Sequence, residues 1–159
     1  MVKIISGPAA AATASGATYL YKDADETVNN STTLQDDDDL TFTMTADKLY
    51  AFEMALLMTG NSSADFKLNI DVASSSTADY LLTYANTGLS FTGEIKWEGQ
   101  NTSVGVDGSW HQSVSAKASG IMVCDGTNRL VKLQWAQASA NASDTKLLKG
   151  SWLAYKELS

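Results

Sequence analysis

Short runs of alternating apolar and polar residues follow one another along most of the chain. The clearest run covers residues 65–72, in which Phe66, Leu68 and Ile70 alternate with polar side chains. Successive side chains of a strand point to opposite faces of its sheet, so this run predicts a strand with one buried face. Similar runs predict about nine strands, over residues 17–22, 40–44, 49–57, 65–72, 79–84, 89–97, 114–124, 129–137 and 147–156.

Strands of this length, separated by turns rich in Gly, Asn, Asp and Ser, are typical of an all-β antiparallel sandwich or barrel. Residues 50–58 are fair helix formers, but they lack helix caps and end in the turn signal of residues 59–61. We therefore predict a strand here, buried on both faces in its second half. Asp125-Gly126 predicts a hairpin turn, because Gly adopts a positive φ at little cost. The residues expected in the core are Phe42, Phe66, Leu68, Ile70 and Trp135.

The beginning of the chain has a different composition. Residues 6–16 include the only proline, Pro8, and are otherwise Ala, Ser, Thr and Gly, which cannot bury enough apolar surface to become ordered alone. We therefore divide the chain into an extended N-terminal arm, residues 1–17, and one domain, residues 18–159. The apolar start is too short for a secretory signal, and no later run approaches the roughly 20 apolar residues of a membrane-spanning helix. We expect a protein made in the cytoplasm.

Charge and composition then exclude several classes of function. A net charge of -7 argues against nucleic acid and anionic membranes as partners, because affinity for phosphates comes mainly from Lys and Arg. The lone cysteine, Cys124, excludes an internal disulfide, and its apolar neighbours predict a small buried side chain. The one histidine, His111, lies in a Gly-rich loop without a nucleophile or phosphate-binding motif. We expect neither catalysis nor a cofactor.

The acidic run of Asp36, Asp37, Asp38 and Asp39 is the one candidate metal site. Calcium needs roughly six to eight oxygen ligands, and the ordered ligand spacing of a calcium loop is missing. Adjacent carboxylates on an extended chain also point to opposite faces. We favour a solvated corner, in which the aspartates form a turn at the rim of a sheet before a strand begins at Leu40. A cation shared between subunits is the alternative.

The two ends of the predicted domain carry the most distinctive motifs. Residues 133–137 read LQWAQ and are followed by a polar turn and a strand that opens with Gly150-Ser151. Nearer the start, an acidic corner after Thr33 leads into a strand and then into residues 49–53, LYAFE. Together, over about residues 25–157, these motifs resemble a jelly-roll domain of tailed-bacteriophage virion proteins. The resemblance implies a sandwich of the tumour-necrosis-factor or complement type, which usually forms trimers.

This resemblance implies a structural or adhesive virion protein. Only about 20 residues precede the first predicted strand, too few for a fibre shaft. We therefore expect a head-decoration (cement) protein, a homotrimer bound to the major capsid protein or to another virion protein. The residues expected to attach the arm to the capsid are Val2, Ile4, Ile5 and Pro8.

Two other functions remain open. A receptor-binding tail or fibre protein would present the loops of residues 73–77 and 99–109 to a host glycan, where Trp97 or Trp110 could stack on sugar rings. Its candidate exposed recognition residues are Asn101, Trp110 and His111. A carbohydrate-active enzyme using Glu94 and Glu98 is the weakest hypothesis. Carboxyls four residues apart on a strand are about 13 Å apart, too far for either common glycosidase geometry.

Overall fold

The computed structural model describes residues 16–61, 63–72, 76–85, 91–96, 104–106 and 114–159, and from residue 77 to residue 114 it describes the backbone alone. All regular structure in these residues is β-strand, which confirms the all-β prediction. The same residues contain no helix of a length and apolarity that could cross a membrane. The strands are β1 (Thr18–Tyr21), β2 (Glu26–Val28), β3 (Gln35–Met44), β4 (Leu49–Thr59), β5 (Phe66–Asp71), β6 (Thr77–Ala85), β7 (Phe91–Lys96), β8 (Val104–Val106), β9 (Val114–Val123), β10 (Arg129–Gln137), β11 (Thr145–Leu147) and β12 (Trp152–Glu157).

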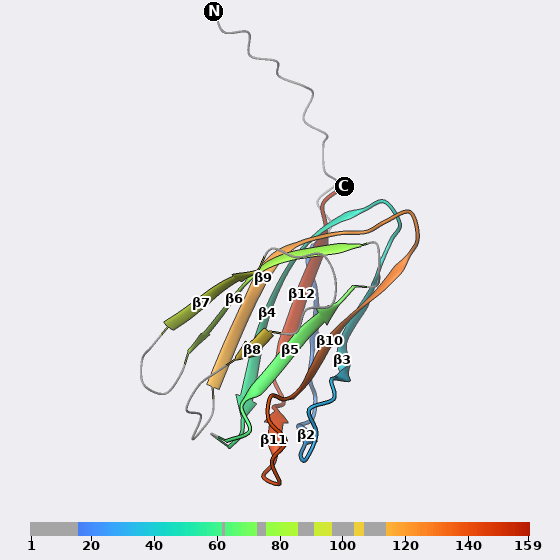
Figure 1. Ribbon diagram of the computed structural model, residues 1–159. Helices are drawn as coiled ribbons and strands as arrows, with labels where there is room; N and C mark the ends of the chain where they lie inside the picture. The colour runs from blue at the N-terminus through green and yellow to red at the C-terminus, as the bar shows by residue number, and fades with distance from the viewer. Residues whose placement is uncertain (1–15, 62, 73–75, 86–90, 97–103, 107–113) are drawn as a thin grey trace, which may run out of the picture.

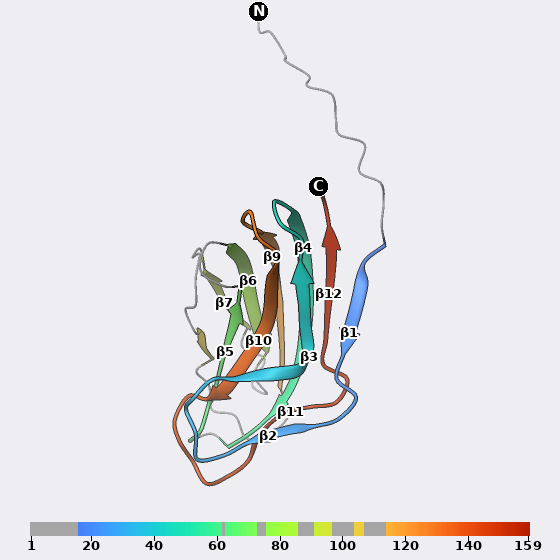
Figure 2. The same ribbon diagram turned by 90° about the vertical axis from the view of Figure 1, so that its right-hand side faces the viewer.

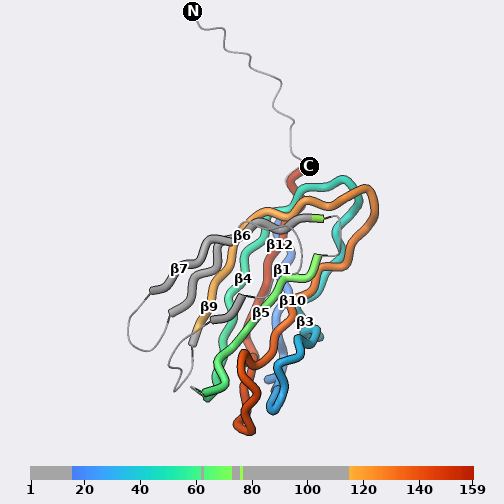
Figure 3. The backbone as a smooth tube through the Cα atoms, in the orientation of Figure 1, coloured from blue at the N-terminus to red at the C-terminus, as the bar shows by residue number. Residues whose placement is uncertain are grey.

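The strands form two antiparallel sheets that pack as two layers (Figures 1 and 2). The larger sheet has the order β1-β12-β4-β9-β6-β7, with β2 and β11 joined at one end, and the smaller sheet has the order β3-β10-β5-β8. The tube in Figure 3 shows the chain passing between the layers at their ends. Most consecutive strands therefore belong to different sheets.

The core lies between the two sheets and follows the predicted alternation. In β4, every second side chain from Tyr50 to Met58 is buried. All five residues expected in the core are buried, and the rings of Phe66 and Trp135 stack with centroids 5.4 Å apart. Cys124 is also buried, as predicted, with its Sγ 3.3 Å from the carbonyl oxygen of Thr127.

The prediction that the second half of β4 is buried on both faces is wrong. Its side chains alternate between buried and more exposed positions to the end of the strand, and Leu57 is 39% exposed. The second layer covers only one face of β4 in the described residues. The apolar residues on the other face are the first sign of an interaction surface.

The hairpin predicted at Asp125-Gly126 is also wrong. β9 pairs with β4 and β6, whereas β10 pairs with β3 and β5, so these residues carry the chain from one sheet to the other. Gly126 does not adopt a positive φ. Instead, the Asp125 carboxylate accepts hydrogen bonds from Arg129 at 2.9 and 2.6 Å and fixes the crossing.

Two short strands were missed and one predicted strand is divided. β2 and β8 contain three residues each, too few for an alternating pattern, and β8 lies inside the loop predicted at residues 99–109. The strand predicted at residues 147–156 is interrupted at Gly150, whose φ is +87°. There the chain turns from β11 into β12.

Candidate functional site

The face of the larger sheet that points away from the smaller sheet is a candidate interaction surface, which we call the outer face. Tyr19 lies opposite Ala154, which lies opposite Glu53, which in turn lies opposite Ser119. Residues directly opposite in adjacent strands share a face. The described residues that these registers assign to the outer face are Tyr19, Tyr21, Leu49, Ala51, Glu53, Ala55, Leu57, Ser115, Lys117, Ser119, Ile121, Val123, Trp152, Ala154 and Lys156.

Large apolar side chains are concentrated on the outer face. Tyr19 and Tyr21 are 66% and 68% exposed, and the ring of Tyr19 lies 5.9 Å from that of Trp152. Six large hydrophobic residues are exposed in the described part of the chain, and five of them belong to this face. The exception is Leu130 on β10. A surface of this kind on one side of a sandwich is typical of a site that another molecule covers.

A shallow depression of about 260 Å³ lies on the outer face beside Tyr19. Its lining includes small residues, Ala51, Ser119 and Ala154, with the longer side chains of Glu53 and Lys156. Small side chains in the middle strands and aromatic ones on β1 and β12 produce a concave surface. A shallow, partly aromatic surface of this kind suits contact with a protein surface or with a ligand that contains a flat ring.

A second feature is a buried ion cluster around Lys22. Because side chains alternate, Lys22 follows the outward-pointing Tyr21 and enters the space between the sheets, where it is 2% exposed. Its Nζ donates hydrogen bonds to Asp37 at 2.7 Å, to Glu26 at 2.9 Å and to Asp39 at 3.3 Å. We call these four residues the Lys22 cluster.

The backbone and a second layer of contacts fix the Lys22 cluster. The backbone N–H of Lys22 donates to the carbonyl of Ser151 at 2.8 Å, and the Lys22 carbonyl accepts from Gly150 at 3.0 Å. Gln35 donates to Glu26 at 3.1 Å. The cluster therefore joins the end of β1 to β2 and β3.

One ammonium faces three carboxylates in this cluster, and this arrangement shifts the pKa values of Lys22 and Glu26. Burial by itself lowers the pKa of Lys22, but hydrogen bonds and the charges of Asp37 and Glu26 outweigh burial and raise that pKa above its usual range. Burial raises the pKa of Glu26, and Asp37 raises it further, against the opposing effect of Lys22. Proton binding to Glu26 is thus more favourable than to an ordinary glutamate.

The acidic run lies inside β3 and not before it. Asp36 pairs with Gln134 and Thr41 pairs with Lys132, so the four residues from Asp37 to Leu40 lie opposite a single residue of β10. This is a β-bulge with three extra residues, larger than the usual single-residue bulge. Figure 2 shows the bend at this end of β3. The predicted corner is present as a bend within the strand.

The prediction that the aspartates are solvated is wrong for Asp37. Its side chain is fully buried because it pairs with Lys22, which lies 15 residues earlier in the chain. Asp37 Oδ1 also accepts the backbone N–H groups of Asp39 at 3.1 Å and Leu40 at 2.7 Å. Asp36 is more exposed and binds Lys132.

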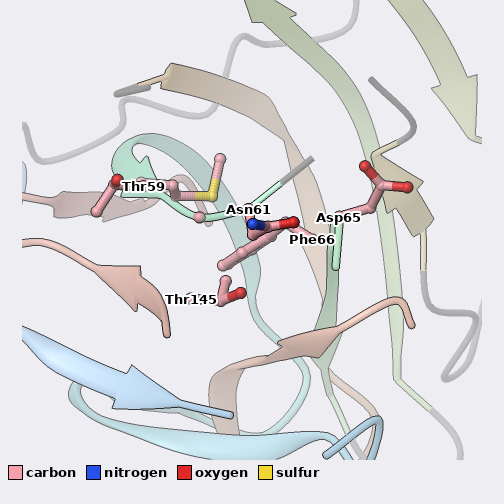
Figure 4. A pocket seen from close by; sticks show the side chains of 7 residues that line it. Thr59, Asn61, Asp65, Phe66 and Thr145 are labelled. Carbon is pink, nitrogen blue, oxygen red and sulfur yellow. The ribbon is translucent and has the colours of Figure 1, made fainter. Parts of the chain in front are cut away.

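In the described part of the chain, no three His, Cys, Asp or Glu side chains form a group that could hold a metal ion. The cation among these carboxylates is the ammonium of Lys22. A small enclosed space near Thr145 offers no alternative site (Figure 4). It measures about 10 Å³ and is lined by Thr59, Asn61, Asp65 and Phe66 among others, which is room for about one water molecule.

Several predicted site residues lie outside the described residues. These are Val2, Ile4, Ile5 and Pro8 of the arm, Asn101, Trp110 and His111 of the recognition loops, and Trp97 and Glu98. Glu94 belongs to β7, of which the backbone alone is described.

The sequence reasoning missed the aromatic residues of the outer face and the Lys22 cluster. The alternation of Tyr19 and Tyr21 in the short strand TYLY could have indicated an aromatic face. No local pattern indicates the contact between Lys22 and Asp37. In comparisons with known proteins, no protein-family model, curated protein or solved structure matches the chain.

Proposed function

We propose that this chain is a non-enzymatic bacteriophage virion protein with a jelly-roll fold, which binds the head surface as a homotrimer and decorates it. The exposed apolar outer face is the observation that carries the proposal, because large exposed apolar patches mark sites of interaction with another molecule. The sequence resemblance to phage virion domains supports the choice of partner, and the strand order is compatible with a jelly roll.

The strand order supports a jelly roll. From β3 to β5, and again from β8 to β10 and on to β12, the chain alternates between the smaller and the larger sheet. In the smaller sheet the strand order is β3-β10-β5-β8, and in the larger sheet four neighbouring strands have the order β1-β12-β4-β9. These two orders fit the two Greek keys of a jelly roll. In this interpretation, β6 and β7 form a hairpin added at the edge of the larger sheet.

A homotrimer would cover the outer face. Three copies around a three-fold axis form repeated contacts in which one patch of each copy meets a different patch of the next. The aromatic residues of β1 and the aliphatic residues of β9 supply the apolar centre that such contacts need. Trimers also match the three-fold and quasi-three-fold positions of an icosahedral shell.

The resemblance to phage virion domains supports the location. The LQWAQ motif forms the second half of β10, and Gly150-Ser151 directly precedes β12. A net charge of -7 suits contact with a basic capsid exterior.

The oligomeric state tests the outer face directly. We expect the purified protein to have the mass of a trimer in light scattering at micromolar concentration, and Ile121→Glu to shift it toward the monomer. Leu130→Glu is the matched control, because Leu130 is also exposed but lies on the other sheet. A wild-type monomer, or equal effects of both substitutions, would refute a trimer built on the outer face.

Binding to particles tests the location. Wild-type protein should bind undecorated heads of the parent phage at saturating stoichiometry and raise the temperature at which they release DNA. Ile121→Glu should bind more weakly. Absence of binding to heads would remove the decoration hypothesis even if the trimer were correct.

The aromatic residues of the outer face also support one rival function, recognition of a host glycan by a tail protein. Tyr19, Tyr21 and Trp152 beside a shallow depression form a surface on which sugar rings could stack. A glycan array separates the two hypotheses. Binding that is lost in Tyr19→Ala and Tyr21→Ala, in a protein that is monomeric, would favour glycan recognition over decoration.

A further inference from the structure

The Lys22 cluster brings an amine and a carboxyl carbon into reactive proximity in a buried place. Nζ of Lys22 lies 2.7 Å from Oδ2 of Asp37, and both side chains are almost entirely buried. A carbon–oxygen bond is about 1.2 Å long, so Nζ lies within about 3.9 Å of Cγ. Reacting atoms in a near-attack arrangement are about 3 to 3.5 Å apart.

The other oxygen of Asp37 is held as an oxyanion would be. Oδ1 accepts two backbone N–H groups, from Asp39 at 3.1 Å and from Leu40 at 2.7 Å. Both donors belong to the bulge of β3 and are therefore fixed before any reaction. Such preorganised donors stabilise the negative charge that develops when a nucleophile adds to a carboxyl carbon.

Glu26 provides a proton carrier at the same place. Its Oε2 lies 2.9 Å from Nζ of Lys22, so both carboxyls, Glu26 and Asp37, contact the same ammonium. Gln35 holds the second oxygen of Glu26 at 3.1 Å. The raised pKa of Glu26 suits a carboxyl that accepts a proton and returns it.

We propose that Lys22 and Asp37 condense to form an intramolecular isopeptide bond, with Glu26 as the group that transfers the proton. Glu26 takes a proton from the ammonium, the amine attacks Cγ, the Nζ–Cγ bond forms and the Cγ–Oδ2 bond breaks. Oδ2 leaves as water with two of the three ammonium protons, one of them returned by Glu26. The third proton stays on the amide nitrogen, and no oxidant or cofactor is consumed.

The bond would join the end of β1 to the bulge of β3 and thereby link the two sheets. β1 is the edge strand from which the N-terminal arm begins. A covalent link at residue 22 would stop a pull on the arm from passing beyond β1 into β2. The carboxylates that orient Lys22 also raise its pKa, so we expect a slow reaction that proceeds after folding.

Intact-mass spectrometry of the full-length protein, fresh and after prolonged incubation, tests the proposal. We expect a mass that is lower than the sequence mass by one water. A protease that cleaves after glutamate opens the chain at Glu26, so residues 22 and 37 should remain joined in a branched peptide. Trypsin should no longer cleave after Lys22. A persistent sequence mass would overturn the proposal.

Three variants identify the source of the lost water. Lys22→Arg keeps the charge but lacks the reactive amine, so it should retain the full mass, whereas Asp39→Asn should still lose one water. Glu26→Gln should slow the loss by about a hundredfold or more, the usual contribution of a general acid–base group.

Asp125-Gly126 can also lose water by forming a cyclic imide. Equal water loss in Lys22→Arg would assign the change to such a site and overturn the proposal.

Discussion

At the scale of single residues, Lys22 determines how the acidic run is used. Four adjacent carboxylates would repel one another and stay in water. One buried ammonium draws Asp37 inside and holds Asp39 beside it, while Lys132 neutralises Asp36 on the outer side of β3. The run therefore divides between the two sides of the strand, and each side has its own cation.

The contacts of Asp36 predict a pH dependence. The hydrogen bond from Lys132 lowers the pKa of Asp36, and a hydrogen bond from Gln134 lowers it further. Because the pKa in the folded state lies below the ordinary value of 3.8, the stabilisation is present above pH 3.8 and is lost as the pH falls through the folded-state pKa. The thermal midpoint of Asp36→Asn should therefore fall less on acidification than that of the wild type. Asp38→Asn, at an exposed neighbour, is the control, and an equal acid dependence of both variants would contradict this prediction.

The ring stack in the core predicts a large cost for Phe66→Ala. The substitution removes a buried ring that lies against Trp135 and leaves a cavity, which should lower the free energy of unfolding by about 3 to 5 kcal/mol. Leu130→Ala, at a position that is 47% exposed, should change it by less than about 0.5 kcal/mol. Chemical denaturation at one fixed protein concentration measures both, and similar costs would mean that the core lies elsewhere.

At the scale of elements, turns and bulges decide where strands end and which sheet they join. The bulge in β3 bends the strand and frees two backbone N–H groups for Asp37. Gly150 turns the chain from β11 to β12, and its N–H bonds the carbonyl of Lys22. The ends of β1, β3 and β12 are thus tied together at one corner of the sandwich.

Two turn glycines, Gly150 between β11 and β12 and Gly126 between β9 and β10, predict opposite outcomes when each is replaced by Ala. Gly150→Ala places a side chain at a φ of +87°, which should lower the free energy of unfolding by about 1 kcal/mol or more. Gly126→Ala has an ordinary φ, and its new methyl would meet only Asp47 at 3.8 Å. That change should be neutral or stabilise by up to about 1 kcal/mol through the unfolded chain. Thermal unfolding compares the two, and a larger loss for Gly126→Ala would contradict the assigned turn.

At the scale of the whole molecule, the two outer sides of the sandwich differ in how many large apolar side chains they expose. Each sheet buries one face against the other sheet, and the larger sheet leaves its aromatic and small residues on the outside. The start of β1 lies beside the end of β12, so the beginning of β1 and the C-terminus lie at the same end of the domain. In the proposed trimer, the three copies of β1 would therefore begin near the same end of the assembly.

Deletion of the arm tests its proposed role in attachment. Removing residues 2–15, which lie outside the described residues, should leave the far-ultraviolet circular dichroism and the proposed trimer unchanged, because the described strands begin at Thr18. Attachment to undecorated heads should be lost. A truncated trimer that binds heads with unchanged affinity would show that the arm has no anchoring role, and the receptor-binding hypothesis would gain support.

The sequence by itself determined most of the strands and the core residues that alternate along them, but not the short strands β2 and β8. Alternation with a period of two is a local property, so it identified Phe42, Phe66 and Trp135 as buried residues before any partner strand was known. Only the tertiary structure decided which strands pair, and it sent the chain across the sandwich at Asp125-Gly126 instead of into a hairpin. It also decided which apolar side chains stay uncovered and that Lys22 meets Asp37. These outcomes depend on contacts between segments distant in sequence, which no local pattern encodes.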